Sequence, residues 1–352
     1  MTDPDTSERS STRGLLLAGA AVVWMAAMLW SARATITGGV DAETTVTNTA
    51  YALPGAVSAS LVAGAAVGLA VVAMIARRRA LGSTTRFVIA IGSGLIIGLL
   101  GALVIFTINT AGWVFAVVAG TVAAAATIGS ALGGFRAAHV VSAVCWAALA
   151  VFVLGFVLNT RDVQAPLLSL LGSGKSQSSQ SSAASWFTFL QSVLSGLAAG
   201  LVGYFSLRRA RRRGDVADIT WPLYAVTGAG PGLLLVVGEA LTRTAGSRVI
   251  DLAGQVSVLE LVVQKMLGGA RLNSALIILF VGAVAAIIAF GRTLKPAADE
   301  EPEQPAVVAR PAKSRTASSR TANSRTSSSR TANSRTPNSR TAETRPTETA
   351  AD

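Results

Sequence analysis

Eight long apolar segments constrain the fold of this chain more than any other feature of its sequence. They lie near residues 14–32, 53–76, 87–108, 112–133, 138–158, 186–207, 221–241 and 273–291. A helix needs about 20 apolar residues to cross the ~30 Å hydrocarbon core of a bilayer, and in lipid it satisfies every backbone N–H and C=O group internally. We therefore expect an all-α polytopic membrane protein with about eight transmembrane helices, preceded by a short N-terminus, 1–13.

The low charge of the chain supports this class. Only 14% of its residues are charged, against about 25% in ordinary soluble domains, which leaves too little polar surface to cover a soluble fold of this size. The net charge is +12, of which +10 falls within residues 1–295, among the apolar segments. Because Lys and Arg collect on the cytoplasmic side of membrane proteins, this excess indicates membrane orientation and not nucleic-acid binding.

The loops give that orientation when the N-terminus is placed in the cytoplasm. The segments that then face the cytoplasm carry 23 of the 30 basic residues, including the Arg-rich runs 77–79 and 208–213. We expect both termini to be cytoplasmic, in the plasma membrane of a bacterium. We interpret the first segment as an uncleaved anchor because its apolar run exceeds the 7 to 15 residues usual in a signal peptide. Cleavage near residues 32–34 is the alternative and would leave seven spans.

The apolar segments also resemble one another in pairs. The Gly-bounded stretches 64–68 and 196–200 both precede Arg-rich runs, and the stretch 94–98 corresponds to 228–232. This pattern predicts four helices duplicated as four plus four. Each unit has an even number of spans, so the halves would share one orientation, as in transporters built from parallel repeats. Chance similarity between Ala- and Gly-rich helices is the alternative.

The seventh segment holds most of the candidate site residues. Gly228, Gly230, Pro231 and Gly232 fall near its middle, and Pro231 cannot donate a backbone hydrogen bond. A break there would free carbonyls near Thr227 and Gly228, and transporters place substrate sites at such breaks. These five residues are therefore candidates for a substrate pathway, with a simple proline kink as the alternative.

Glu239 completes the candidate set as the only carboxylate close to the apolar core. It follows Pro231 by eight residues, about 12 Å along a helix, which puts it near the outer boundary of the membrane. A carboxylate in a span is a functional candidate, but at this depth we favour a solvated side chain or an ion pair with Arg243 one turn later. No span has a charged residue at its centre, which argues against a proton pump or a sodium-coupled antiporter.

No catalytic or metal-binding constellation emerges from the sequence. The chain has one His and one Cys, and His139 and Cys145 lie about 240° apart round a helix, on different faces. The stretch 172–176 resembles the end of a phosphate-binding loop but lacks the required Gly where Ser169 stands. We therefore expect no enzyme, no catalytic residues, no cofactor and no metal.

Three segments outside the spans have recognisable character. Apolar residues recur at helical spacing within the insertion 242–272, which predicts an amphipathic helix that lies on the outer face or caps the bundle. A helix that only packs on its neighbours is the alternative. The stretch 177–185 is Ser-rich and predicts an outer linker. Residues 296–352 contain a five-residue Ser/Arg/Thr repeat, which predicts a disordered tail.

The expected partners follow from these charges. The lipid bilayer is the first, and the basic cytoplasmic loops and tail are suited to anionic lipids or proteins. The tail has no aromatic residues for base stacking, so we expect no specific nucleic-acid recognition.

The stretches 232–243, 251–254 and 267–273, leading into Phe280 and residues 290–292, resemble an uncharacterised family of multi-pass membrane proteins from high-GC Gram-positive (actinobacterial-type) bacteria. The resemblance implies a plasma-membrane protein of the cell envelope and supplies no activity or ligand. With the seventh segment, it leads us to expect a transporter or permease-like protein. A noncatalytic envelope scaffold or partner-binding protein is the alternative.

Overall fold

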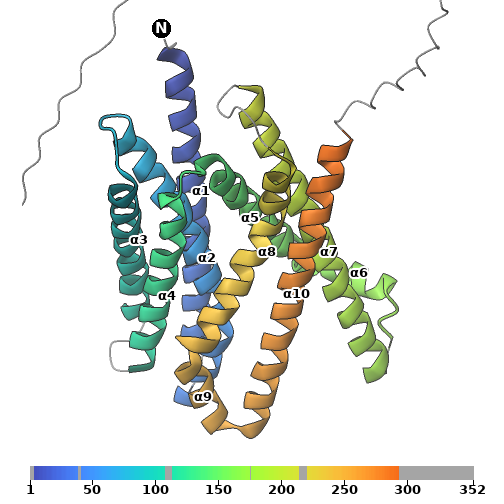
Figure 1. Ribbon diagram of the computed structural model, residues 1–352. Helices are drawn as coiled ribbons and strands as arrows, with labels where there is room; N and C mark the ends of the chain where they lie inside the picture. Colours follow the sequence, from blue (N-terminus) through green and yellow to red (C-terminus); the bar gives the residue numbers. More distant parts are fainter. Residues whose placement is uncertain (1–3, 39–40, 108–112, 175, 214–219, 293–352) are drawn as a thin grey trace, which may run out of the picture. The chain divides into compact units, whose positions relative to one another are not determined.

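The computed structural model describes residues 4–38, 41–107, 113–174, 176–213 and 220–292, and every regular element in these ranges is a helix (Figure 1). In chain order they are α1 (Pro4–Thr37), α2 (Ala42–Ala76), α3 (Ser83–Phe106), α4 (Trp113–Ala131), the 3-10 turn η1 (Leu132–Gly134), α5 (Ala138–Leu158), α6 (Arg161–Leu170), α7 (Gln177–Arg212), α8 (Trp221–Thr244), α9 (Ser247–Val256) and α10 (Val258–Gly291).

Eight of the described helices have the length and apolar composition needed to cross a membrane: α1 to α5, α7, α8 and α10. This confirms the all-α polytopic class and the expected number of spans. Contacts divide the chain into the units Met1–Pro296 and Ala297–Asp352. The predicted tail, 296–352, lies outside the described residues.

The Ser-rich stretch 177–185 is helical, so its prediction as a linker was wrong. It forms the first turns of α7, and the hydroxyl of Ser176 caps them by accepting a hydrogen bond from the backbone N–H of Ser179 at 3.3 Å. Helix propagation is much less costly than nucleation, so a capped polar stretch can extend the apolar helix that follows it. The short α6, which precedes this stretch, was not expected from the sequence.

The predicted amphipathic insertion, 242–272, divides between two helices. Its first part forms α9, and the chain turns at Ser257, which has an extended backbone. From Val258 onwards the insertion is the first part of α10 and continues directly into the last span. Only α9 therefore fits the expected separate helix, and it packs against α2, α4, α8 and α10 with Val249 fully buried.

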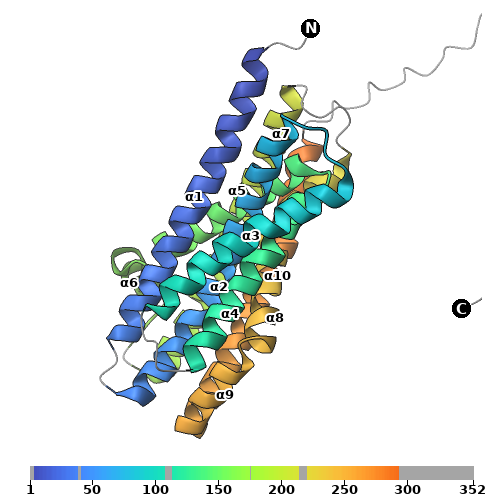
Figure 2. The same cartoon turned by 90° about the vertical axis from the view of Figure 1, so that its left-hand side faces the viewer.

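Two groups of helices build the bundle (Figures 1 and 2). In the first, α1 packs along α2, and both α2 and α3 pack against α4; in the second, α5 packs along α7, and both α7 and α8 pack against α10. The groups meet where α2 contacts α5 and α8. The largest apolar core cluster runs from α1 through α5 to α8 and α9, so side chains fill the space between the groups.

Candidate functional site

The seventh predicted segment is one continuous helix, so of the two alternatives at Pro231 it does not have the break. α8 runs through Pro231 to Thr244. The proline deprives the Thr227 carbonyl, four residues earlier, of its usual donor. Gly203 of α7 packs against that carbonyl, with a distance of 3.1 Å from the position that a Cβ would occupy. Close packing of neighbouring helices is one way in which proline is tolerated inside a span.

The candidate pathway residues lie at close helix–helix contacts. Gly228 meets the backbone of Gly282 on α10, Gly232 meets the backbone of Leu279 on α10, and Gly230 faces Val144 on α5. Pro231 is buried and Thr227 is fully buried, with its hydroxyl donating to the Tyr224 carbonyl at 2.8 Å. Small residues let membrane helices approach this closely, so packing accounts for Thr227, Gly228, Gly230, Pro231 and Gly232.

Glu239 lies on α8 between two arginines. Arg243 Nε, one turn later, donates to Glu239 Oε1 at 2.9 Å, and Arg271 Nε, on α10, donates to Oε2 at 3.0 Å. The Glu239 side chain is only 5% exposed, whereas those of Arg243 and Arg271 are 44% and 32% exposed. The predicted ion pair with Arg243 is therefore confirmed. Arg271 adds a second bond that joins the two helices.

A cavity of about 210 Å³ opens beside this cluster. Three cationic and two anionic side chains contribute to its lining, together with Ser247, Ile250, Gln264 and Gly268; the charged residues are Arg243, Lys265, Arg271, Glu239 and Asp251. Gly268 on α10 leaves room for the Glu239 carboxylate on α8, because a Cβ at residue 268 would lie 2.9 Å from Glu239 Oε1. The excess of one positive charge suits a carboxylate or another small anion.

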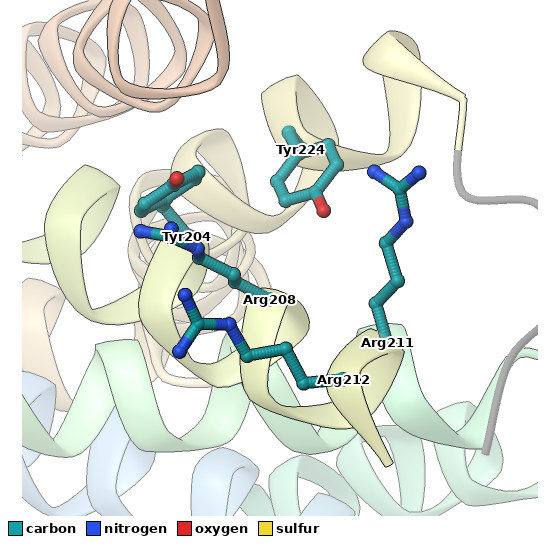
Figure 3. Close-up of a pocket in the computed structure, with 5 residues that line it drawn as sticks. All are labelled: Tyr204, Arg208, Arg211, Arg212 and Tyr224. Carbon is teal, nitrogen blue, oxygen red and sulfur yellow. The ribbon is translucent and has the colours of Figure 1, made fainter. Parts of the chain in front are cut away.

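A second cavity, of about 300 Å³, lies where α7 ends and α8 begins (Figure 3). Its lining comprises Tyr204, Arg208, Arg211 and Arg212 from α7 and Tyr224 from α8. Tyr224 precedes Glu239 by fifteen residues on α8, about 22 Å along the helix. The two cavities therefore lie toward opposite ends of α8.

Sequence reasoning missed parts of both cavities. Arg271 is 32 residues from Glu239, and a single sequence gives no measure of such a long-range contact. The second cavity did leave a signal: Tyr204, Arg208 and Arg212 follow one another at intervals of four, which places them on one helix face. The sequence predicts that these arginines set the membrane orientation and suit anionic lipids or proteins, but it does not predict a cavity shared with two tyrosines.

No three His, Cys, Asp or Glu side chains come together as a metal-ion site in the part of the chain that the structure describes. Comparisons with models of protein families, with curated proteins and with solved structures found no match to this chain. The function must therefore be argued from the geometry alone.

Proposed function

We propose that this chain is a noncatalytic integral membrane protein of the bacterial cell envelope that holds a partner protein at the end of the bundle formed by α9 and the start of α10. The observation that carries the proposal is an exposed apolar stripe on α10. It consists of Val258, Leu259, Val262 and Met266, whose exposed fractions lie between 47% and 77%. At 100° per residue these four positions fall within an arc of about 100° on one helix face.

The position of this α10 stripe favours a protein partner over lipid. α10 has 34 residues, about 51 Å at 1.5 Å per residue, whereas the hydrocarbon core is only ~30 Å thick. When the span is placed at 273–291, as the apolar pattern of the sequence predicts, the stripe begins about 10 Å beyond the span and ends about 22 Å beyond it. Exposed apolar patches mark sites of protein or membrane interaction, and the distance of this stripe from the hydrocarbon core favours a protein.

The Glu239 cluster supports this role by fixing the projecting part of α10. Arg271 lies between the stripe and the span, and its bond to Glu239 holds α10 against α8. A pre-organised surface loses less conformational entropy when it binds. Lys265 lies on the helix face next to Val258 and Val262. The partner that fits best is an apolar helix with an acidic residue opposite Lys265.

Site-specific photocrosslinking in intact cells tests this proposal. A photoreactive amino acid is placed at Leu259, Val262 or Met266, with Phe280 and Val284 as matched controls on exposed positions of the same helix within the span. We expect one discrete protein adduct from all three stripe positions, and its loss when Lys265→Glu is added. The two controls should yield lipid adducts. Lipid adducts from the stripe would show instead that it anchors in the bilayer interface.

A permease built from two parallel four-helix units is the second candidate. It is supported by the contacts of two helix pairs, α3–α4 and α8–α10, which have the same spacing. In each pair the first helix has two glycines four residues apart, and the residues that they contact on the second helix are seven apart. These contacts are Gly94–Ser130 and Gly98–Ala123 in the first pair, and Gly228–Ala286 and Gly232–Leu279 in the second. Parallel repeats of this kind occur in transporters.

Distance measurements between the two units distinguish the two candidates. Spin labels at Leu103 on α3 and Leu233 on α8, both exposed, report the separation of the units in lipid bilayers. A permease that alternates between two states should give two distance populations. The partner-binding protein should give one, because a filled apolar core joins its halves.

A further inference from the structure

The cavity where α7 ends collects three positive charges. Arg208, Arg211 and Arg212 line it, and none of them forms an ion pair with any carboxylate in the described ranges. Together with Tyr204 they occupy an arc of about 100° on one face of α7. Like charges four residues apart, such as Arg208 and Arg212, destabilise a helix, and an anion bound between the side chains would offset that cost.

The buried tyrosine beside these arginines lacks a hydrogen-bond partner. Tyr204 is 4% exposed, and its hydroxyl has no partner among the residues that the structure describes. Buried hydroxyls are nearly always paired, so this one calls for a partner from outside the described residues. Arg208 lies over the Tyr204 ring, 5.8 Å from its centroid, which fixes the position of its guanidinium.

The second tyrosine, Tyr224, also lines this cavity. Tyr224 packs 5.7 Å from Tyr204 and 4.8 Å from Phe290, measured between ring centroids. Figure 3 shows its hydroxyl directed into the space beside the Arg211 side chain. The lining of the cavity thus combines guanidinium and phenol groups, which donate hydrogen bonds, with aromatic rings.

We propose that this Arg/Tyr cavity binds a phosphate group. Guanidinium groups match phosphate oxygens with two parallel hydrogen bonds, and a volume of about 300 Å³ reaches the range of small-molecule sites. Arginines in the last turn of a helix also stabilise its dipole. That effect accounts for Arg211 and Arg212, but it leaves the buried Tyr204 hydroxyl and the cation–π contact of Arg208 unexplained.

The phosphate can come from a phospholipid headgroup or from a soluble phosphate compound. Phe205 follows Tyr204 in the sequence and Trp221 precedes Tyr224 by three residues. Both are exposed apolar residues that could contact acyl chains. Basic pockets between helices at the membrane surface bind anionic headgroups. The experiment therefore includes both sources.

Binding to the purified full-length protein tests the proposal, with native mass spectrometry as the readout. The probes are phosphatidylglycerol added to the detergent micelle and inorganic phosphate in solution. The key variant is R208Q/R212Q. Its matched control is R209Q/R213Q, which removes the same charge at the same spacing from the C-terminal end of α7, where Arg213 is the residue after the helix, and from residues outside the cavity lining.

We expect R208Q/R212Q to weaken binding about a hundredfold, because each charge-assisted hydrogen bond contributes about a factor of ten. R209Q/R213Q should weaken it less than about threefold. Tyr204→Phe should weaken binding about fivefold without lowering the melting temperature of the ligand-free protein, which a purely structural hydroxyl would do.

Two results support the proposal and separate its sources. Phosphatidylglycerol that excess inorganic phosphate does not displace identifies a lipid headgroup site, whereas saturable binding of inorganic phosphate itself identifies a site for soluble phosphate compounds. The proposal is overturned if neither probe binds, or if the two double variants weaken binding equally.

Discussion

The ion-pair cluster at Glu239 gives the sharpest quantitative prediction. Glu239 is buried and both of its oxygens are paired, one within α8 and one across to α10. Glu239→Gln keeps the size of the side chain but removes the charge that holds both arginines. The comparison variants are Arg243→Gln and Arg271→Gln, each of which removes one of the two bonds.

The expected magnitudes follow from exposure. Breaking a fully buried pair costs about 3–5 kcal/mol, but Arg243 and Arg271 are 44% and 32% exposed, so water screens part of the loss. We expect Glu239→Gln to destabilise the protein by about 2–3 kcal/mol. Arg271→Gln should cost about 1.5 kcal/mol because it removes the bond between helices. Arg243→Gln should cost about 0.5 kcal/mol, as for other exposed pairs within one helix.

Equilibrium unfolding in mixed micelles, followed by tryptophan fluorescence, measures these differences. Double-variant cycles then isolate each pair. The coupling free energy between Glu239 and Arg271 should be about 1.5 kcal/mol, and that between Glu239 and Arg243 about 0.5 kcal/mol or less. Equal couplings, or a cost below about 0.5 kcal/mol for Glu239→Gln, would refute the reasoning that the cluster joins α8 to α10.

Three further predictions test packing and topology. Gly268→Ala should be about 1 kcal/mol less stable than Gly269→Ala. A Cβ at 268 would lie 2.9 Å from Glu239 Oε1, so the carboxylate end must shift, whereas a Cβ at 269 meets open space. The reverse order would contradict the geometry. Gly228→Ala should lower the free energy of unfolding by at least about 2 kcal/mol, since its Cβ would overlap the backbone of Gly282. Gly120→Ala is the control because a Cβ there meets open space. Equal melting temperatures of the two variants would disprove the close contact. A maleimide that cannot cross the membrane should label Ser178→Cys on intact cells, and Arg79→Cys only after the cells are permeabilised. The native Cys145 is buried and should not react. The opposite labelling pattern would invert the predicted topology.

Apolar length predicted the spans well because it directly measures what a bilayer requires. It predicted the helix ends less well. α7 and α10 both extend past their apolar segments, since a helix already nucleated within the membrane propagates into capped or unbroken polar sequence. The short α6 has ten residues and none of them is buried, so it gives no apolar segment of membrane length that would predict it.

Pro231 shows why the candidate pathway could not be settled from the sequence. Proline and glycine within a span indicate a broken helix and a tightly packed helix equally well. The difference lies in what faces them, here Gly203, Gly282 and Leu279 from other helices. The Glu239–Arg243 pair was predictable because both residues lie on one helix, whereas Arg271 and the Arg/Tyr cavity depend on how helices distant in sequence come together.

Measuring the depth of the α10 stripe tests the central claim most directly. Spin labels at Val262 and Met266, and at Phe280 and Val284 as references within the span, are compared in lipid bilayers for collisions with oxygen and with a water-soluble nickel complex. We predict that the labels at Val262 and Met266 collide mainly with the nickel complex, and those at Phe280 and Val284 mainly with oxygen. Oxygen-dominated collisions at all four positions would place the stripe in hydrocarbon and contradict a partner-binding surface there.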